Sequence, residues 1–554
     1  MSQPASRTGC DVLLEVLATE GVRHVFGNPG TTELPFMEAL AGRSTGAGPE
    51  YVLGLQEATA VGMADGYAQV TGRPAFLNLH TAAGLGNAVG NLVGARANAT
   101  PLVVTAGQQD RRHLAAEPLL SGNLTGLARE VSRWAHEVNT VGELGTMLRR
   151  AFQDAATPPT GPVFLSVPMD ILDEATDALV PPPSTLDRRV VAASLDELVR
   201  LLLASAPGRL AIVAGDEVAG SGAVESLVRV AVTLGAVVYG SPLHSNTVFP
   251  TTHPLWYGSL PPTAEGVRES LSEFDQVFLV GGQAFMSYPY TPGAPLPEHT
   301  ELLHLSSDPV QPGRTWPTRL GLTGDPRLTL EAILPRLREA APEDASAALV
   351  RAREQRERVV AEAEERAESA YQEQPMLPAA AVHALLRALP DDMPVVDEAV
   401  TAGAHVRRFH RTTQPGRYFF CRSGGLGWGM PAAAGVSLGL GREPVLCVVG
   451  DGSAMYAPQA LWTAAQLRLP VIFVVIGNGE YRILKDAMRG RGGGSEKPPT
   501  VGMDLAEPSL DFRALAASMG VPATYVDRAD DVGEAVEAAA GTDGPHLLHL
   551  AVGS

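Results

Sequence analysis

The chain has 554 residues, which at roughly 150 residues per domain favours three or four domains over one. With 42 Lys and Arg against 61 Asp and Glu, its formal net charge is −19. This charge excludes a basic nucleic-acid binder, because the field of the protein would repel a polyanion. A hydrophobic content of 45%, with 58 Gly and 44 Pro, excludes a disordered chain and suits a large core crossed by many turns.

The number of cysteines and the length of the apolar runs exclude further classes of protein. The three cysteines, Cys10, Cys421 and Cys447, are too few and too scattered for a disulfide framework or a zinc site. Residues 1–9 lack a positively charged region followed by an apolar run, so we expect no signal peptide. The longest apolar runs, such as 470–476, are much shorter than the roughly 20 residues that cross a bilayer. We therefore expect a soluble, cytoplasmic, multidomain protein that binds neither membrane nor nucleic acid.

Short apolar runs alternate with helix-length segments from the start of the chain. In the first block, buried strands of a parallel sheet are predicted at 22–26, 51–55, 75–79, 102–105 and 163–167. Segments 10–20 and 58–70 have the apolar spacing that is typical of helices. Three consecutive prolines at 181–183 predict a stiff extended linker and mark the end of this block.

Two further blocks repeat the alternation of strand and helix. Strands are predicted at 209–214, 237–239, 276–280 and 302–305 in the second block, and at 395–396, 445–449 and 471–476 in the third. In 351–370, 11 of 20 residues are charged and of both signs, which predicts a solvated connecting helix. Because such crossovers are right-handed, the pattern predicts an α/β protein with three doubly wound parallel-sheet domains in tandem. The predicted bounds are 1–183, 184–342 and 374–554, with the charged helix in 343–373.

The strongest chemical motif is Gly450-Asp451-Gly452-Ser453, which is followed 27 residues after the aspartate by Asn478. Asp451 follows one predicted strand and Asn478 the next, with a predicted helix at 457–467 between them. In an open parallel sheet, ligands bind beyond the carboxyl ends of the strands, so we expect both side chains at one site. A carboxylate and an amide oxygen suit Mg²⁺, and glycines at a helix N-terminus let a phosphate approach the backbone. The alternative is an ordinary strand-to-helix turn.

This stretch resembles the thiamine diphosphate (ThDP) binding motif, which opens with Gly-Asp-Gly and closes with Asn-Asn. Gly477 stands in place of the first asparagine, and the second, the usual metal ligand, is present as Asn478. By this resemblance Asp451, Asn478 and the main-chain carbonyl of Glu480 hold a divalent ion, Mg²⁺ or Ca²⁺, that anchors the diphosphate. The resemblance implies the ThDP-enzyme fold, with a pyrimidine-binding first domain and a diphosphate-binding last domain.

A second motif supports the same family from the other end of the chain. Glu57, in LGLQEATAVGMADGYA, follows a predicted strand and begins a helix; taken alone, it would be a surface or helix-capping residue. In ThDP enzymes a glutamate in this context binds the aminopyrimidine ring and promotes loss of the thiazolium C2 proton, so that the cofactor acts as an electron sink. Because the family joins this glutamate and the metal site from two subunits, the resemblance implies at least a homodimer, and we expect a homotetramer.

Within the family, VFGNPGTTELPF and FLNLHTAAGLGNAVGNL resemble the benzoylformate decarboxylases more than the acetolactate synthases. The similarity extends over essentially the whole chain and is loosest in the second block. It implies that His80 is the active-site histidine, although a lone histidine at a strand end is more often structural. It also implies that Leu426 supports a bent cofactor. The implied cofactor contacts are Asn28, Val400, Thr401, Gly424, Gly425, Leu426, Asp451, Gly452, Ser453, Asn478, Glu480 and Tyr481.

The sequence departs from the decarboxylase pattern at several positions. Thr31 replaces a serine that contacts the substrate carboxylate in that family, which keeps the hydroxyl but stiffens the side chain. Tyr288 stands where the decarboxylase has a second histidine. In the expected apolar substrate pocket, Ile483 is larger and Ala487 smaller than their counterparts. The pocket is expected to be lined by Leu120, Val400, Phe420, Ile483 and Ala487.

Together these features predict a ThDP- and Mg²⁺-dependent lyase that decarboxylates an aromatic or branched 2-oxo acid, without oxidation, to an aldehyde. Its expected catalytic residues are Thr31, Glu57, His80 and Tyr288. Two alternatives stay open: an acyloin- or acetolactate synthase-like carboligase that passes the same enamine to a second carbonyl, and a ThDP-binding paralogue without turnover. FAD, which some relatives bind in the middle domain, is not expected, and a colourless preparation would distinguish this protein from a flavoprotein.

Overall fold

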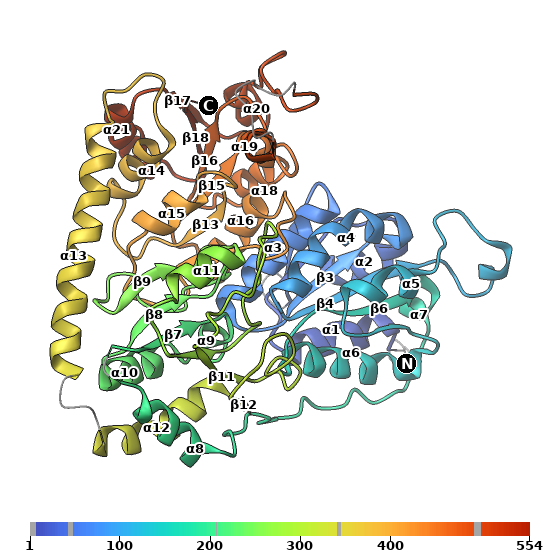
Figure 1. Ribbon diagram of the computed structural model, residues 1–554. Helices are drawn as coiled ribbons and strands as arrows, with labels where there is room; N and C mark the ends of the chain where they lie inside the picture. Colours follow the sequence, from blue (N-terminus) through green and yellow to red (C-terminus); the bar gives the residue numbers. More distant parts are fainter. Residues whose placement is uncertain (1–6, 43–47, 207, 341–344, 492–499, 554) are drawn as a thin grey trace.

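The computed structural model describes residues 7–42, 48–206, 208–340, 345–491 and 500–553. These residues form three six-stranded sheets in which every pair of neighbouring strands is parallel. Helices pack on the sheets in all three parts of the molecule (Figure 1). The predicted α/β class, with three tandem doubly wound parallel sheets, is confirmed.

The first sheet has the strand order β2-β1-β3-β4-β6-β5. Its strands are β1 (His24–Gly27), β2 (Glu50–Leu53), β3 (Ala75–Leu79), β4 (Leu102–Gln108), β5 (Ala135–Glu137) and β6 (Val163–Pro168). The helices around it are α1 (Gly9–Thr19), α2 (Leu34–Ala41), α3 (Glu57–Thr71), α4 (Thr81–Ala97), α5 (Leu124–Ala128), α6 (Val141–Ala156) and α7 (Met169–Asp173), with the 3-10 turn η1 (Thr31–Glu33). The apolar pattern located every strand except β5, which is only three residues long and half-buried.

The second sheet has the order β12-β11-β10-β7-β8-β9. Its strands are β7 (Leu210–Ala214), β8 (Val237–Gly240), β9 (Trp256–Ser259), β10 (Gln276–Val280), β11 (Glu301–Ser306) and β12 (Leu320–Thr323), and its helices are α8 (Leu195–Ala204), α9 (Glu217–Gly220), α10 (Val224–Leu234), α11 (Ala264–Ser270) and α12 (Pro326–Glu339). The two strands that were not predicted, β9 and β12, are the edges. The charged helix forms as α13 (Ala345–Ser369), which is largely exposed and runs along the outside of the second and third parts (Figure 1, yellow).

The third sheet has the order β14-β13-β15-β16-β18-β17. Its strands are β13 (Val395–Glu398), β14 (Tyr418–Phe420), β15 (Val445–Gly450), β16 (Val471–Gly477), β17 (Ala523–Val526) and β18 (His546–Ala551). Its helices are α14 (Pro378–Arg387), α15 (Gly403–Phe409), α16 (Gly429–Gly439), α17 (Asp451–Ala454), α18 (Ala460–Gln466), α19 (Arg482–Arg491), α20 (Phe512–Ser518) and α21 (Ala529–Ala540). The helix predicted at 457–467 forms as α18 but begins three residues later than predicted, and the short helix α17 before it was not predicted. Pro458 lies between them, and proline cannot donate the backbone hydrogen bond that a continuous helix requires there.

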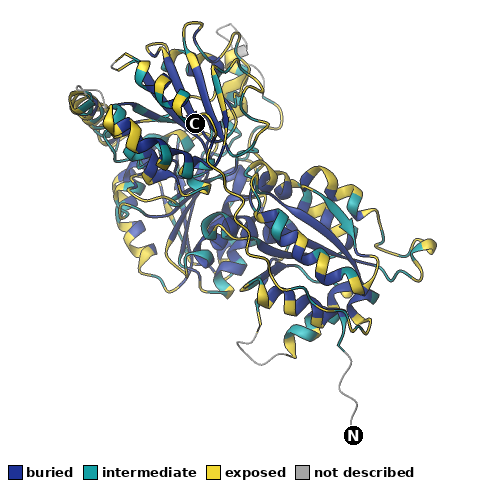
Figure 2. Cartoon of the chain, turned by 90° about the horizontal axis from the view of Figure 1, so that it is seen from below, coloured by how far each residue is buried: buried dark blue, intermediate teal, exposed yellow. Residues whose placement is uncertain are grey.

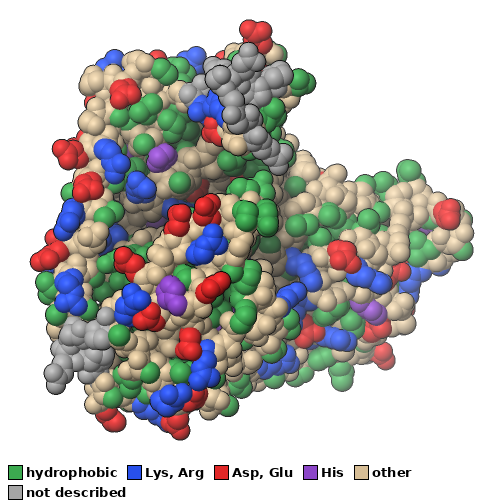
Figure 3. All heavy atoms as spheres, in the orientation of Figure 1, with side chains coloured by type: hydrophobic (Ala, Val, Ile, Leu, Met, Phe, Trp, Pro, Cys, Tyr) green, Lys and Arg blue, Asp and Glu red, His purple; other side chains and the backbone are tan. Residues whose placement is uncertain are grey.

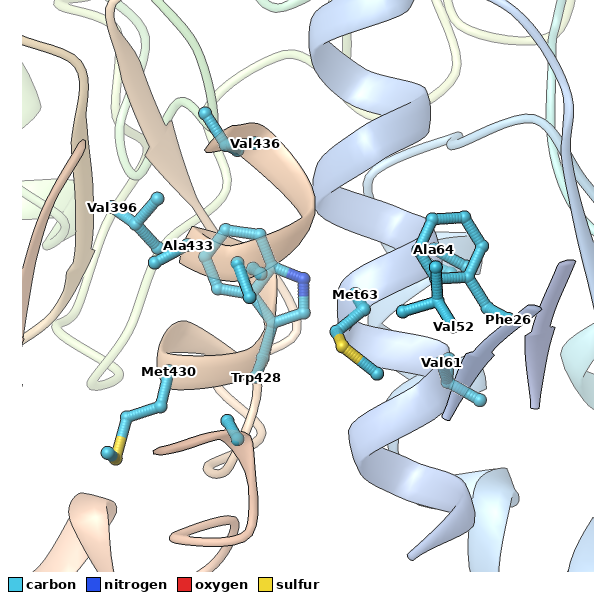
Figure 4. Packing of buried hydrophobic residues seen from close by; sticks show 14 of the residues in the cluster. Phe26, Val52, Val61, Met63, Ala64, Val396, Trp428, Met430, Ala433 and Val436 are labelled. Atoms are coloured by element: carbon cyan, nitrogen blue, oxygen red, sulfur yellow. The ribbon is translucent and has the colours of Figure 1, made fainter. Parts of the chain in front are cut away.

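The first and third sheets share one topology. Counted within each sheet, both have the order 2-1-3-4-6-5, although no sequence repeat joins the two blocks. Helices α3 and α16 occupy equivalent places after the second strand, and they pack directly on each other (Figure 4). A β-carbon at Gly66 would collide with the carbonyl of Ala432, and one at Gly435 with the carbonyl of Met63. The two backbones therefore touch because both contact positions are glycine.

This helix pair carries a core that is continuous between the first and third sheets. Phe26, Met63 and Trp428 are fully buried in one cluster that extends to residues of β15 and β16. The indole Nε1 of Trp428 donates to Oδ2 of Asp65 at 2.8 Å, so the polar edge of the largest buried ring has a partner. Figure 2 shows the buried strands inside and the exposed helix faces outside.

The surface carries both signs of charge in mixture. On the face drawn in Figure 3, acidic and basic side chains are interspersed, so the net charge of −19 is not gathered into one patch there. No helix in the described ranges is long and apolar enough to cross a membrane.

The glycine contacts between α3 and α16 can be tested by stability. We expect Gly66→Ala and Gly435→Ala each to lower the free energy of unfolding by about 1–3 kcal/mol, because an added methyl group has no free space there. Gly533→Ala is the matched control: this glycine of α21 has nothing within 4 Å of its β-carbon position, so stability should be unchanged or higher. Thermal unfolding measures all three, and equal melting temperatures would contradict the packing argument.

Candidate active site

The strand order reverses beside β1 in the first sheet and beside β13 in the third. Such a switch point creates a crevice at the carboxyl ends of the strands, where open parallel sheets usually bind ligands. In the first sheet, Asn28 follows β1 and His80 follows β3. In the third sheet, Val400 lies just after β13 and Asp451 just after β15. The predicted site residues thus occupy equivalent positions of two equivalent sheets.

Glu57 is the first residue of α3 and is buried. Two asparagine amides bind its carboxylate: Nδ2 of Asn28 donates to Oε1 at 3.1 Å, and Nδ2 of Asn87 donates to Oε2 at 3.0 Å. Both donors are neutral, so they orient the carboxylate without cancelling its charge, and free lone pairs remain for a further donor. Gly84 lies beside Oε1, where a β-carbon would be at 3.0 Å. Asn87 was not predicted, because an exposed amide on a helix has no distinguishing pattern.

His80 is held by two residues that the sequence patterns did not indicate. Its Nδ1 lies 2.9 Å from Oε2 of Glu33 and 3.1 Å from Oγ1 of Thr32. The hydrogen bond to Glu33 raises the pKa of His80 above its ordinary value, although desolvation opposes the rise. The next residue, Thr81, is fully buried with a φ of 52°, a left-handed conformation that β-branched residues rarely adopt. Such backbone strain concentrates at functional sites.

Thr31, a predicted catalytic residue, is exposed, whereas its neighbour Thr32 is buried. The Thr32 hydroxyl donates to Oε1 of Glu33 at 2.7 Å and lies beside the His80 ring. Both threonines belong to η1, and successive side chains of a 3-10 turn point roughly 120° apart. The structure therefore brings the Thr32 hydroxyl, and not that of Thr31, to His80. A substrate contact for Thr31 stays a prediction.

Asp451 is buried at the start of α17, and main-chain groups hold its carboxylate. Oδ1 accepts the N–H of Gly452 at 2.7 Å, and Oδ2 accepts the N–H groups of Asn478 and Gly479 at 3.0 and 2.8 Å. The motif spacing therefore joins the turns after β15 and β16, as predicted. Carboxylate, amide and main-chain oxygens are the ligands that Mg²⁺ prefers, so these residues fit a metal that anchors a diphosphate.

In the part of the chain that the structure describes, no group of three or more His, Cys, Asp and Glu side chains could hold a metal ion. The predicted ligand set needs no such group, because only Asp451 contributes a carboxylate. The carbonyl of Glu480 accepts the N–H of Arg482 at 3.0 Å and keeps a second lone pair. The Glu480 side chain forms an ion pair with Lys485, so its charge is compensated and does not add to that of Asp451.

Three other predicted cofactor contacts, Gly452, Ser453 and Tyr481, lie at or beside this turn. The ring of Tyr481 packs where a β-carbon on Gly452 would be, so only glycine fits at that position. Ser453 is buried and Thr401 is exposed.

A buried glutamate holds the loop that carries the predicted cofactor contacts 424–426. Glu398, the last residue of β13, accepts the main-chain N–H groups of residues 427, 428 and 429 at 2.8, 2.7 and 2.6 Å. Burial raises the pKa of Glu398 to about 7, although the three bonds act against the rise. The loop after β14 is thereby attached to the end of the neighbouring strand β13. Sequence reasoning missed this residue because a glutamate that ends a short strand carries no motif.

The predicted pocket residues lie largely on the surface of this single chain. Leu120 is 36% exposed, Val400 52% and Ile483 45%. Ala487 is also exposed, and Phe420 is half-buried against the guanidinium of Arg407, 4.8 Å from the ring centroid. Most of the side chains that are expected to line the pocket are therefore open to solvent in the single chain.

Tyr288 lies in the loop after β10 and is 72% exposed. Among the described residues, no hydrogen bond joins its phenol to either switch point, and none joins Glu57 or His80 directly to Asp451. The structure thus brings the predicted residues together as two groups, one in the first domain and one in the third, with Tyr288 apart from both.

Comparison with known proteins adds three family matches. The chain matches three models of the thiamine pyrophosphate (TPP) enzyme family, in which pyrophosphate is another name for diphosphate. These models describe the N-terminal TPP binding domain, matched by residues 7–130, the central domain, matched by 195–333, and the C-terminal TPP binding domain, matched by 401–550.

Individual relatives match over most of their length. The chain is 36% identical to benzoylformate decarboxylase of Pseudomonas aeruginosa over 551 residues, 97% of each protein. It is 28% identical to the large subunit of acetolactate synthase isozyme 3 of Escherichia coli over 491 residues, 86% of this chain and 83% of that protein. The solved structure of the thiamine diphosphate-dependent 4-hydroxybenzoylformate decarboxylase of Rhodococcus jostii RHA1 has a TM-score of 0.85 at 30% identity, with 99% of both chains covered.

The metal site can be tested by cofactor retention. We expect Asp451→Ala to weaken Mg²⁺-dependent binding of ThDP by more than roughly 10²-fold, because the ion loses its only carboxylate ligand. Calorimetric titration of the apoprotein with ThDP, with Mg²⁺ and with EDTA, measures this. Asp275→Ala, which removes an exposed carboxylate of the second domain, is the control. Unchanged ThDP affinity in Asp451→Ala would show that the metal is assigned to the wrong residues.

Proposed function

The chain belongs to the thiamine pyrophosphate enzyme family, and we propose that it removes CO₂ from an aromatic or branched 2-oxo acid and releases an aldehyde. The observation that carries this proposal is the arrangement of Glu57 and His80 around the switch point of the first sheet, each oriented by hydrogen bonds from polar side chains. The bound cofactor supplies the electron sink that makes loss of CO₂ feasible. The chain itself supplies charge, orientation and protons.

Two groups of residues would hold ThDP in this proposal. Glu57 would bind the pyrimidine ring, since its carboxylate is buried, oriented by two amides and still able to accept a hydrogen bond. Asp451 and Asn478, with the carbonyl of Glu480, would hold Mg²⁺ and through it the diphosphate. Leu426 would support the cofactor between them, on the loop that Glu398 fixes.

The nature of the pocket walls supports an apolar substrate side chain. Leu120, Phe420 and Ile483 offer aromatic and branched surfaces, of the kind that lines pockets for apolar ligands. One similar solved structure is that of a 4-hydroxybenzoylformate decarboxylase, which also favours an aromatic 2-oxo acid over a short aliphatic one.

A second copy of the chain would complete this site. Among the described residues no hydrogen bond joins Glu57 or His80 to Asp451, and the expected pocket residues Leu120, Val400 and Ile483 are exposed. Because the first and third sheets share one topology, a two-fold arrangement can place the first domain of one copy against the third domain of the other. Each dimer would then have two equivalent sites, and two dimers would form the expected tetramer.

A carboligase is the second candidate, and Tyr288 favours it. An unperturbed tyrosine, with a pKa near 10, is a weaker acid at neutral pH than a histidine near 6.5. Slower protonation of the carbon that lost CO₂ leaves more time for it to join a second carbonyl. The similarity to an acetolactate synthase subunit is in keeping with this branch of the family.

The reaction can be tested by a screen of 2-oxo acids with ThDP and Mg²⁺ that follows CO₂ and the organic product separately. Decarboxylation of benzoylformate or of a branched 2-oxo acid to its aldehyde is the expected result. Release of CO₂ with a coupled hydroxyketone as the main product would favour the carboligase. Failure to release CO₂ from any of the acids, even in a single turnover, would contradict both and favour a ThDP-binding protein without turnover.

Glu57→Gln tests the pyrimidine contact. We expect ThDP still to bind, while exchange of the cofactor's C2 proton slows by roughly 10²–10⁴-fold, the usual contribution of a general acid–base group. Proton exchange in D₂O, followed by NMR on the bound cofactor, measures this. Glu50→Gln, an exposed glutamate of β2, should exchange like the wild type. Normal exchange in Glu57→Gln would remove this residue from the mechanism.

Tyr288 can be tested through the product ratio. Tyr288→His should raise the share of aldehyde, because histidine delivers a proton faster at neutral pH. Tyr288→Phe should lower aldehyde release without slowing CO₂ loss. Chromatographic measurement of aldehyde and ligation product from one 2-oxo acid distinguishes the variants. If both leave the ratio unchanged, the phenol only forms part of the pocket wall.

A further inference from the structure

A buried carboxylate lies directly behind His80. The Glu33 side chain is 1% exposed, whereas that of His80 is 19% exposed, so the acid is the inner member of the pair. Three donors surround it: the N–H of Gly30 and the His80 ring at Oε2, both at 2.9 Å, and the Thr32 hydroxyl at Oε1, at 2.7 Å. In the part of the chain that the structure describes, His80 is the only ion-pair partner of Glu33.

The backbone around this pair leaves no spare room. A β-carbon at Gly30 would collide with the His80 ring, and one at Gly107, on β4, would collide with Oε1 of Glu33 and with Thr32. The ring and the carboxylate are therefore enclosed from both sides. Contacts as tight as these restrict His80 to one orientation, in which Nδ1 faces Glu33.

A buried carboxylate destabilises the folded protein unless it is paired and hydrogen-bonded. The 2.9 Å contact between Oε2 and Nδ1 is a hydrogen bond to the carboxylate only if the His80 ring donates from Nδ1, because a carboxylate accepts hydrogen bonds and cannot donate them. The Thr32 hydroxyl is already committed as a donor to Oε1. With Nδ1 committed to Glu33, the ring exposes Nε2 on its outer side, as a base when neutral and as an N–H donor when charged.

The negative charges around His80 all favour the protonated form of its ring. Glu33 raises the pKa of His80 by its hydrogen bond and its charge, and Glu57, at the start of α3, raises it further, while desolvation opposes both. Burial raises the pKa of the neighbouring Tyr51 phenol well above its ordinary value, so this group adds no charge beside Glu33. His80 therefore keeps its proton to higher pH than a free histidine.

We propose that Glu33 is a positioning residue for the reaction: its buried carboxylate holds His80 with Nδ1–H inward and presents Nε2–H to the substrate as a proton donor. The role of Nε2–H as a proton donor rests on the proposed function, whereas the pairing of Glu33 with His80 does not depend on it. A group that must be protonated to act loses activity as pH rises through its pKa. Glu33 therefore extends the active pH range of the enzyme upward.

The experiment combines NMR and kinetics on the ThDP-loaded holoenzyme. With ¹⁵N- and ¹³C-labelled histidine, His80 is assigned among the 13 histidines by its loss in His80→Gln. The wild-type spectrum above the His80 pKa should show the Nδ1–H tautomer. In Glu33→Gln the His80 pKa should fall, the alkaline limb of kcat/KM should move to lower pH in step, and kcat/KM near pH 7.5 should drop by roughly 10²-fold.

Two further variants separate positioning from general loss of structure. Glu50→Gln is the matched control, because Glu50 also lies beside a histidine, His24, but is half-exposed and at 3.7 Å; it should change neither the His80 pKa nor kcat/KM. Thr32→Val removes the hydroxyl and leaves the carboxylate, so it should shift the His80 pKa less than Glu33→Gln does.

Two results would overturn the proposal: an Nε2–H tautomer of His80 in the wild type, or an unchanged His80 pKa in a folded Glu33→Gln. The first needs no variant, so it holds even if Glu33→Gln fails to fold. If no 2-oxo acid is turned over but the NMR results are as expected, the proposed function fails while the pairing of Glu33 with His80 stands.

Discussion

Direct backbone contact between α3 and α16 determines the relation of the first domain to the third. At Gly66 and Gly435 no side chain separates the helices, so their separation and crossing are determined by main-chain atoms, which are harder to displace than side chains. The contact also reaches the candidate site. Buried Asn91 donates through Nδ2 to the carbonyls of Ala58 at 2.7 Å and Gly427 at 3.2 Å. These two hydrogen bonds hold the start of α3, which carries Glu57, beside the loop that precedes α16.

Near this helix pair, Glu33, Glu57, Glu398 and Asp451 are buried at or beside the ends of strands. Neutral donors, either main-chain N–H groups or amides, satisfy the last three, and a histidine satisfies the first. A neutral donor compensates desolvation without cancelling charge. In our proposal, carboxylates bound in this way suit a divalent ion at Asp451 and the cofactor ring at Glu57.

Equivalent positions of the two related sheets carry different chemistry. The residue after the third strand is His80 in the first domain and Asp451 in the third. One is held for proton transfer in our proposal, and the other for metal binding. The shared topology leaves no trace as a sequence repeat, because a parallel sheet requires only buried apolar strands at suitable intervals and tolerates many residues in each.

The sequence by itself determined the α/β class, most buried strands and the joining of Asp451 to Asn478, because apolar runs and motif spacing are local properties. The resemblance of its motifs added Glu57 and His80. The apolar pattern did not reveal β18 or the edge strands β5, β9, β12, β14 and β17. The residues of β5, β9, β12 and β17 are partly exposed and lack a continuous buried run. Only the tertiary structure identified Glu33 and Glu398 as buried, since each meets its partner across 47 and 29 residues of chain. The sequence alone does not distinguish a buried acidic residue beside a turn from a solvent-exposed one, because burial depends on the elements that pack over it.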